Sequence, residues 1–307
     1  MIRRFKFLYA FYNFFQKKKL LHNIPVYKKL GLKKKYYSSV SSKDFVNCGA
    51  VGEEKKIKTI SENTAIFKRL DSDSQQSILN FEMLGYARIG NYLSGKQTDV
   101  INAEIDKLLQ QGKIKFNEKQ KIMFAIHHSE ALREVANDPD LLELLRSLIG
   151  GDVQLFQSIN FFKGSEQKTH SDSIHMTTYP TGGLLGIWIA LEDIDSDNGP
   201  LHYYPGSQKL PYYFNADYDN EGSRFLLGEK DYSAYESMLE NKVQDNQMEK
   251  KIFTAKKGDL LIWHANLLHG GEPHINKEKT RKSVVFHYYN TECVCYHEIT
   301  QRPALIG

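Results

Sequence analysis

Apolar and polar positions follow two different periods along this chain of 307 residues, and the change falls near residue 151. Before that point, apolar residues recur at the three- and four-residue intervals of helices. We predict a helix over residues 98–111, where Thr98 or Asp99 can cap the first turn. Its apolar face would consist of Val100, Ile101, Ile105, Leu108 and Leu109.

Two other segments of the first half show local signals for helices. Residues 138–149 begin with a capping Asp138 and a proline in the first turn, continue with leucines, and stop at a glycine pair. Residues 78–92 predict a short helix, a turn at Gly85 and then a strand. The first half of the chain is therefore expected to be mainly helical.

Beyond Gly151 the sequence becomes rich in Phe, Ile, Val and Tyr, and turn residues separate the apolar runs. Strands are predicted over residues 153–162, 184–192, 200–204, 251–255, 259–263 and 283–290. A polar insertion over 208–250 is predicted to contain one helix near 231–244. Helices followed by strands indicate an α+β protein with a jelly-roll barrel.

Charge is distributed unevenly. Residues 1–45 contain twelve Lys or Arg and one acidic residue, whereas the rest of the chain has 29 basic and 36 acidic residues. Residues 1–60 are therefore assigned to a basic, aromatic-rich N-terminal extension and residues 61–307 to the main domain. In that domain a helical lead-in over 61–150 precedes a jelly roll over 151–307.

The extension contains aromatic and apolar residues at helical spacing between Arg3, Arg4 and a run of three lysines. They are Phe5, Leu8, Phe11, Tyr12 and Phe15. Such a helix can lie on an anionic membrane surface as a peripheral contact, or it can pack its aromatic rings on the barrel. A secretory signal is disfavoured because no small-residue cleavage site follows, whereas an organelle transit peptide stays open. No nucleic-acid-binding motif accompanies the charge.

Cysteine content and hydropathy bear on the compartment. The chain has three cysteines, Cys48, Cys293 and Cys295, which is too few and too odd a number for a disulfide framework. The sequence contains no run of about 18 apolar residues, which is the length needed to cross a bilayer. We expect a cytoplasmic protein, with contact at the membrane surface as the option that the basic extension leaves open. The sequence does not indicate an oligomeric state.

Three residues have the types and spacing of a metal site. His170 and Asp172 are two positions apart, so in an extended chain both side chains face the same side. A distant strand should supply the third ligand, and His269 in GDLLIWHANLLHGG is the best candidate, ahead of the competing His264. Two imidazoles and one carboxylate on one face of an octahedron are typical of non-haem Fe(II) oxygenases, with three positions left for co-substrate and O₂.

An arginine and a serine follow at the start of the last strong strand. Arg281 and Ser283 would face the same side of that strand. A guanidinium group can bind a carboxylate of 2-oxoglutarate through two parallel hydrogen bonds, and the hydroxyl group can add a third. The alternative is that Arg281 is an exposed charge, like its neighbour Lys282.

At these residues the sequence resembles the phytanoyl-CoA dioxygenase family of Fe(II)/2-oxoglutarate-dependent oxygenases. The resemblance covers roughly residues 78–304 and is carried by GSEQKTHSDSIHM, GIWIALEDIDSDNGPLHYYPGSQK, GDLLIWHANLLHGG and TRKSVVFHYY. It implies a double-stranded β-helix, the jelly roll also found in cupins, with supporting helices packed on one sheet. It also implies that His170, Asp172 and His269 hold iron and that Arg281 pairs with 2-oxoglutarate. Gln208 replaces a histidine of the family pattern that is not a metal ligand.

The resemblance also implies further binding residues. Trp188 stands where the family carries a tryptophan near the co-substrate, and Gln157 would hydrogen-bond 2-oxoglutarate. His175, Tyr179 and Tyr203 are candidates for contact with substrate, and the 208–250 insertion could act as a lid. The remaining histidines singled out, His127, His128 and His274, are expected at the surface.

The expected reaction is hydroxylation of an unactivated C–H bond, with O₂ consumed and succinate and CO₂ released. The substrate would be a small molecule or a lipid-linked or glycoconjugate compound. Two other readings stay open: a metal-dependent cupin-like isomerase or hydrolase that does not use 2-oxoglutarate, and a jelly-roll binding protein without catalytic activity.

Overall fold

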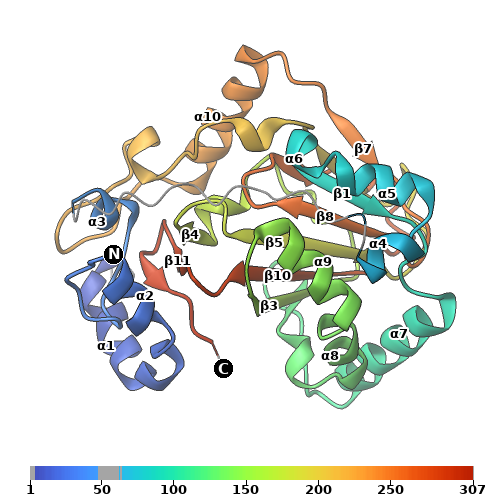
Figure 1. Cartoon of the computed structure of the whole chain (residues 1–307), viewed down its shortest axis with the longest axis horizontal. Helices are drawn as coiled ribbons and strands as arrows, with labels where there is room; N and C mark the ends of the chain where they lie inside the picture. The colour runs from blue at the N-terminus through green and yellow to red at the C-terminus, as the bar shows by residue number, and fades with distance from the viewer. Residues whose placement is uncertain (1–3, 48–61, 63, 307) are drawn as a thin grey trace.

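One six-stranded sheet and two three-stranded sheets, with helices on the outer face of the larger sheet, form the body of the protein in the computed structural model (Figure 1). The structure describes residues 4–47, 62 and 64–306. Arg3, Cys48 and the part of the predicted extension over 48–61 lie outside the described residues. Every named strand pairing is antiparallel, so the α+β jelly roll predicted from the sequence is confirmed.

The larger sheet has six strands in the order β1-β8-β5-β10-β3-β2. These strands are β1 (Tyr86–Ile89), β2 (Lys121–Met123), β3 (Val153–Phe161), β5 (Leu184–Ala190), β8 (Leu260–His264) and β10 (Ser283–Asn290). Neighbouring strands are far apart in sequence, as in a jelly roll, because each strand returns beside one from an earlier turn of the barrel.

Two three-stranded sheets complete the β-structure, in the orders β7-β6-β9 and β12-β11-β4. The first contains β6 (Leu201–Tyr203), β7 (Lys251–Phe253) and β9 (His269–Gly271). The second contains β4 (Thr177–Tyr179), β11 (Val294–His297) and β12 (Arg302–Pro303). All six strands predicted from the sequence are present, with ends that differ by at most two residues. The strands β2, β4, β9, β11 and β12 were not predicted, since runs of two to four residues carry little periodic signal.

Alternate side chains of the central strands point to opposite faces of the larger sheet and belong to two different hydrophobic cores. On β5, Leu185, Ile187 and Ile189 face the helices, whereas Trp188 and Ala190 face the space between the sheets. All of these residues are at most 1% exposed, so both faces of β5 are buried. The inner face of the larger sheet is therefore the wall against which a site can form.

The helices of the first half pack on the outer face of the larger sheet through one apolar cluster (Figure 1). They are α4 (Ala65–Arg69), α5 (Ser72–Leu79), α6 (Phe81–Leu84), α7 (Gly95–Gln110), α8 (Glu130–Ala136) and α9 (Pro139–Ile149), with the 3₁₀ helix η3 (Ala125–His127). The boundaries of α9 agree with the prediction, including the Asp138 cap and a left-handed Gly150. The turn at Gly85 between α6 and β1 is also confirmed.

Helix α7 differs from the prediction in its cap and in one face residue. It begins four residues earlier than expected from Thr98, because Ser94 and Gln97 form a reciprocal capping box. Thr98 instead lies inside the helix, and its hydroxyl donates to the Gly95 carbonyl at 2.8 Å. Val100 is 52% exposed, so its assignment to the apolar face was wrong, while Ile101, Ile105 and Leu108 are buried.

The insertion and the connections carry the remaining helices. Helix α10 (Tyr232–Asp245) lies in the 208–250 insertion and is capped by Asp231, close to the predicted boundaries. Short 3₁₀ helices occur at η4 (Asp172–Ile174), η5 (Ser207–Lys209) and η6 (Asn215–Tyr218). None of the helices among the described residues has the length and hydropathy needed to span a membrane.

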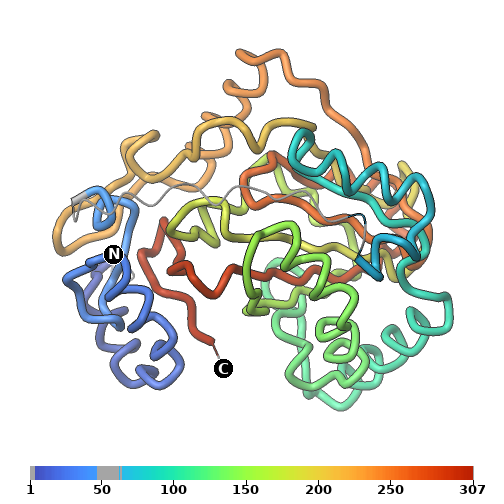
Figure 2. The backbone as a smooth tube through the Cα atoms, in the orientation of Figure 1, coloured from blue at the N-terminus to red at the C-terminus, as the bar shows by residue number. Residues whose placement is uncertain are grey.

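The N-terminal segment forms a compact group of helices beside the C-terminal end of the chain (Figure 2). It contains α1 (Lys6–Phe15), η2 (Lys17–Leu20), α2 (Asn23–Lys29) and α3 (Ser42–Asn47). Tyr27, Val40 and Phe45 pack with Val294 and Tyr296 of β11 in one buried cluster. Part of this segment therefore packs on the β-structure, mainly through α2 and α3, while the phenylalanines Phe7, Phe11 and Phe15 of α1 are exposed.

Candidate metal centre

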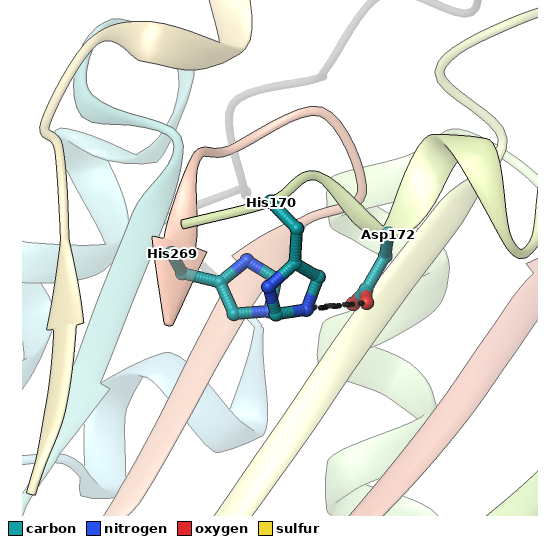
Figure 3. A group of neighbouring side chains, drawn as sticks. All are labelled: His170, Asp172 and His269. Carbon is teal, nitrogen blue, oxygen red and sulfur yellow. Dashed lines mark ion pairs between the residues drawn. The ribbon is translucent and has the colours of Figure 1, made fainter. Parts of the chain in front are cut away.

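The two histidines of the predicted metal site are brought together by backbone pairing. The amide group of each donates to the carbonyl oxygen of the other at 2.9 Å, so His170 and His269 form one antiparallel bridge. His269 is the first residue of β9, and His170 lies in the loop that runs beside it (Figure 3). The prediction that Asp172 lies in an extended chain was wrong, because this residue begins the 3₁₀ helix η4. Its carboxylate group nevertheless points toward the two histidines.

The ligand atoms of His170, Asp172 and His269 all lie within 4.8 Å of one another, and all three residues are buried. His170 Nε2 is 3.9 Å from Asp172 Oδ1, and His269 Nε2 is 3.8 Å from Asp172 Oδ2. The Nδ1 atoms are engaged elsewhere, at 2.8 Å from the Lys168 carbonyl and 2.9 Å from the Leu267 carbonyl. These contacts favour the Nδ1–H tautomer, which turns the Nε2 lone pairs of both histidines toward the cluster. Gln167 Nε2 lies 3.1 Å from His170 Nε2, so a cation at this atom would replace the Gln167 contact.

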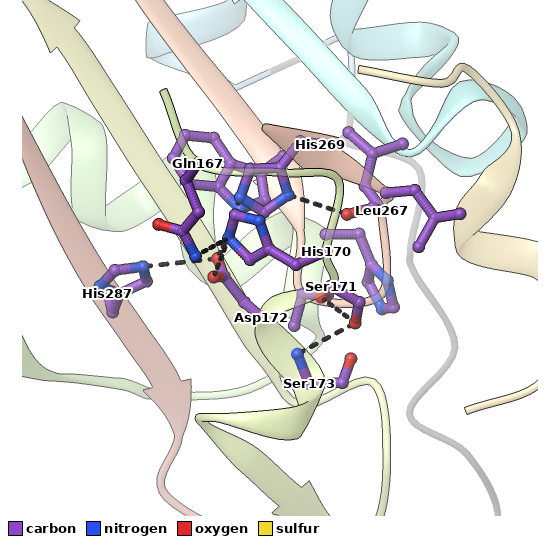
Figure 4. Close-up of polar contacts among 12 residues, drawn as sticks. Gln167, His170, Ser171, Asp172, Ser173, Leu267, His269 and His287 are labelled. Atoms are coloured by element: carbon purple, nitrogen blue, oxygen red, sulfur yellow. Dashed lines mark hydrogen bonds and ion pairs between the residues drawn. The ribbon is translucent and has the colours of Figure 1, made fainter. Parts of the chain in front are cut away.

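The Asp172 carboxylate is held in place by two groups that sequence analysis had not identified. Trp263 on β8 donates its indole N–H to Asp172 Oδ2 at 2.8 Å. His287 on β10 places Nε2 3.4 Å from the same oxygen (Figure 4). The sequence could have indicated His287, because it is an even number of positions from Arg281 and Ser283 and so faces the same side of the strand.

The protonation states of the triad also fit a cation site. Burial alone would raise the pKa of the Asp172 carboxyl group, but His269, His287 and His170 together hold that pKa well below its ordinary value. Burial lowers the pKa of His170 far below its ordinary value, and the nearby His269 lowers it further. At neutral pH the site therefore contains one carboxylate and a neutral His170, the forms that coordinate metal ions.

Arg281 lies in the same cavity as the triad and is only 1% exposed. Its Nη1 donates to Ser283 Oγ at 2.7 Å, while Nε and Nη2 have no hydrogen-bond partner within the described part of the chain. Burial lowers the pKa of Arg281 to about 10, so the group is still a cation at pH 7. A buried cation with unused donors is costly unless an anion completes its hydrogen bonds, so the site fits a bound carboxylate.

Two cavities meet at the triad. The smaller, of about 70 Å³, joins the three candidate ligands to Arg281 and Trp188. The larger, of about 820 Å³, extends from the triad past α10 to the C-terminal residues 299–305. Lys121 and Gln167 line both cavities, and Gln167 Nε2 lies 3.1 Å from His170 Nε2. No sequence signal had indicated Lys121, which lies on a strand of only three residues.

The predicted co-substrate residues are divided between these cavities. Trp188 lines the smaller one, with its ring centre 6.0 Å from Arg281 Cζ, and its indole N–H has no partner among the described residues. Ser283 contacts Arg281 directly. Gln157 instead lines the larger cavity and is cross-strand neighbour to His287, so it does not border the cavity that contains Arg281.

Of the predicted substrate residues, only His175 lines a cavity that reaches the triad. Its ring packs against Tyr232 of α10 at a centroid distance of 4.8 Å. Tyr179 stacks on Phe45 of the N-terminal segment at 4.0 Å, and Tyr203 packs on Tyr86 at 4.4 Å. The structure therefore places both tyrosines away from the cavity linings.

The other histidines are sorted by burial. His127 and His128 are exposed, as predicted. His274 was predicted at the surface, but it is buried, because its Nδ1 accepts from the Gly164 amide at 3.0 Å and its Nε2 lies 3.1 Å from the Lys279 carbonyl. His264 is buried on β8 and is not part of the ligand cluster. Gln208 is also outside the site, since its amide group donates to the backbone of α6.

Two solved structures with folds similar to this chain have names that include 2-oxoglutarate (alpha ketoglutarate). EctD from S. alaskensis, with 2-oxoglutarate and 5-hydroxyectoine, superposes with a TM-score of 0.59 at 20% identity, covering 77% of this chain and 81% of EctD. SnoK, a non-heme alpha ketoglutarate dependent carbocyclase from nogalamycin biosynthesis, gives a TM-score of 0.58 at 16% identity and covers 74% and 87% of the two chains. At these identities the likeness establishes the fold.

Sequence relatives point to the same group. Phytanoyl-CoA dioxygenase domain-containing protein 1 from Rattus norvegicus is 28% identical over 173 residues, covering 54% of this chain and 56% of that protein. The match thus spans little more than half the length of that relative. Ectoine dioxygenase from Halomonas elongata is 26% identical over 250 residues, 74% of each chain. The sequence model of the phytanoyl-CoA dioxygenase (PhyH) family matches residues 81–283, which include all three candidate ligands and Arg281, and the chain belongs to this family.

Proposed function

We propose that this protein is an Fe(II)- and 2-oxoglutarate-dependent dioxygenase that hydroxylates an unactivated C–H bond of its substrate. The observation that carries the proposal is the buried, incompletely hydrogen-bonded Arg281 in the same cavity as a His-Asp-His cluster. The cluster supplies the ligands that a non-haem iron site needs, and the guanidinium group supplies the counter-charge for a dicarboxylate co-substrate.

Each group has a defined task in this proposal. His170, Asp172 and His269 would hold the iron through two Nε2 atoms and one carboxylate, and Arg281 with Ser283 would bind the distal carboxylate of 2-oxoglutarate. Trp188 would border the co-substrate, and its indole N–H is available as a donor. Bound iron and 2-oxoglutarate supply the oxidising chemistry, with O₂ consumed and succinate and CO₂ released. The apolar walls around the triad exclude water from the reacting C–H bond.

The alternative functions use less of the site. A cupin-like isomerase or hydrolase would use the metal cluster but has no need of a buried guanidinium group beside it. A binding protein without catalytic activity has no need of three buried ligand atoms within 4.8 Å of one another. The dioxygenase is favoured because it accounts for both features.

The substrate would occupy the larger cavity of about 820 Å³. Its lining combines apolar side chains with the cations Lys119, Lys121 and Arg302, so it suits a compound with an apolar part and an anionic group. We propose a small molecule or a lipid-linked or glycoconjugate substrate, with His175 near its binding site and the 208–250 insertion as a lid through Tyr232. Gln157 borders this cavity and would reach the substrate more readily than the co-substrate.

We also propose that residues 61–307 form the catalytic domain and that residues 1–60 are an extension. The small number of cysteines favours a cytoplasmic location. Contact with a membrane surface through the basic extension fits this location and a lipid-linked substrate.

Anaerobic titration with Fe(II) and 2-oxoglutarate tests the proposal directly. A weak charge-transfer band near about 500 nm is expected when a 2-oxo acid chelates iron in such a site. The double variant Asp172→Ala/His269→Ala should lose the band, whereas His264→Gln, a buried histidine outside the cluster, should retain it. A wild-type protein without the band, or a band that survives in the double variant, rules out the assignment.

A further inference from the structure

Helix α1 turns a stripe of aromatic side chains toward solvent. Phe7, Phe11 and Phe15 follow one another at four-residue spacing and are 62%, 65% and 67% exposed. The opposite side of the helix is the attached side, where Asn13 is buried and its amide group donates to the Tyr37 carbonyl at 3.2 Å. An exposed apolar stripe of this size marks an interaction surface.

Lysines lie directly beside the stripe. Lys17, Lys18 and Lys19 in η2 are exposed, and Lys17 Nζ is 5.0 Å from the centre of the Phe14 ring. The first acidic residue of the chain is Asp44, which is already paired with Lys34 at 2.8 Å. Arg4 pairs with Glu229 at 2.8 Å, whereas Lys17, Lys18 and Lys19 form no ion pair with the described residues. The surface formed by α1 and η2 therefore combines apolar rings with the positive charge of these three lysines, as in helices that lie in the interface of anionic bilayers.

We propose that this surface, residues 4–20, docks the protein on an anionic lipid bilayer, with the phenylalanine rings among the acyl chains and the lysines at the headgroups. A second copy of the chain is a poorer occupant, because a symmetric contact would place the same lysines against one another. Nucleic acid would use the lysines but not the apolar stripe. The proposal is independent of the oxidation chemistry.

The docking surface is attached to the body at several points, so docking would fix the orientation of the whole protein. The Lys6 amide donates to the Phe225 carbonyl at 3.0 Å, and the Ile306 amide donates to the Lys19 carbonyl at 3.1 Å. Figure 2 shows this segment beside the C-terminal end of the chain.

Arg302 connects this segment to the larger cavity. The Arg302 guanidinium group lies over Tyr9 and Tyr12 of α1, at 5.2 Å and 5.7 Å from the ring centres. Arg302 also lines the cavity, together with residues 299–300 and 303–305. Arg302 therefore lies between α1 and the cavity, and docking would bring this end of the cavity near the bilayer, where a docked protein could receive an amphiphilic substrate.

Cosedimentation of the full chain with vesicles tests the docking. Binding to phosphatidylcholine vesicles with about 30% phosphatidylserine should exceed binding to pure phosphatidylcholine by at least about tenfold and should weaken with salt. The triple variant Phe7→Ser/Phe11→Ser/Phe15→Ser and the triple variant Lys17→Glu/Lys18→Glu/Lys19→Glu should each lose at least about tenfold in partition.

Matched controls come from other surfaces of the body. Val100→Ser/Ile252→Ser/Ile275→Ser removes three side chains that are 52%, 50% and 68% exposed, and it should bind vesicles as the wild type does. Lys96→Glu/Lys113→Glu/Lys115→Glu makes the matching charge change at exposed lysines of the first half. Thermal unfolding of all four variants checks that each is folded.

Three results would overturn the proposal. The first is wild-type protein that stays in the supernatant with anionic vesicles. The second is loss of binding in the control variants to the same extent as in the α1 and η2 variants. The third is a dimer in light scattering that the phenylalanine variant dissociates, or binding to duplex DNA or RNA in place of vesicles, since either assigns the surface to another partner.

Discussion

Trp263 donates its indole N–H to Asp172 across 91 positions of sequence, at 2.8 Å from the carboxylate oxygen Oδ2. The same oxygen lies 3.8 Å from His269 Nε2 and 3.4 Å from His287 Nε2. Trp263 therefore fixes the rotation of the carboxylate group relative to the histidines. A hydrogen bond to the non-coordinating side of a ligand orients that ligand and tunes its affinity for metal.

Trp263→Phe should weaken Fe(II) binding by about 10- to 100-fold, since it removes the N–H but keeps an aromatic ring beside His269. Anaerobic titration with a competing chelator measures the affinity, and thermal unfolding shows whether the variant is folded. Unchanged Fe(II) affinity in a folded variant would mean that the hydrogen bond does not orient the ligand.

Space for the Trp263 ring is provided by a glycine on the neighbouring strand. A Cβ at Gly186 would lie 2.3 Å from Cε2 of the indole group, so any larger residue must displace the ring. Gly186→Ala should destabilise the protein by about 1–3 kcal/mol and also weaken Fe(II) binding. The control Gly95→Ala adds a Cβ where no atom lies within 4 Å, at the start of α7, so it should leave Fe(II) binding unchanged and should not destabilise the protein. Denaturant unfolding and the same metal titration give both values.

The parts of the fold that the sequence predicted are those with local signals. Asp138, Pro139 and Gly150 carry the start and end of α9 in adjacent residues, and β10 is a long apolar run. The cap of α7 was misplaced because Thr98, an acceptable cap by type, lies four residues after the better reciprocal pair of Ser94 and Gln97.

In the site, too, residues with a local sequence signal were predicted, whereas contacts between distant segments were not. Residue types and spacing identified His170, Asp172, His269 and Arg281, whose side chains all line one cavity. The contact between Trp263 and Asp172 joins β8 to η4 across 91 positions of sequence, and no local pattern indicates such a contact. Tyr179 was a candidate for contact with substrate, yet β4 places it against Phe45 in another cluster.

Arg281→Ala should weaken 2-oxoglutarate binding by about 2–4 kcal/mol, because it removes the cation that faces the smaller cavity. Lys282→Ala is a matched control, since Lys282 points away from the cavity and pairs with Asp106 at 3.2 Å. Titration of the charge-transfer band with 2-oxoglutarate gives the affinity. Equal affinity in the Arg281 variant and the wild type would remove this residue from the co-substrate site.

The buried His264 should make stability depend on pH. Burial lowers its pKa from 6.5 to about 4, so the folded protein keeps it neutral while the unfolded chain takes up a proton below pH 6.5. The free energy of unfolding should therefore fall as the pH decreases from 6.5 to about 4, by about 3 kcal/mol at most from this residue. Denaturant unfolding across this range should give a smaller slope for His264→Gln than for the wild type, whereas the exposed His128→Gln should leave the slope unchanged. Equal slopes in His264→Gln and the wild type would show that His264 does not resist protonation in the folded state.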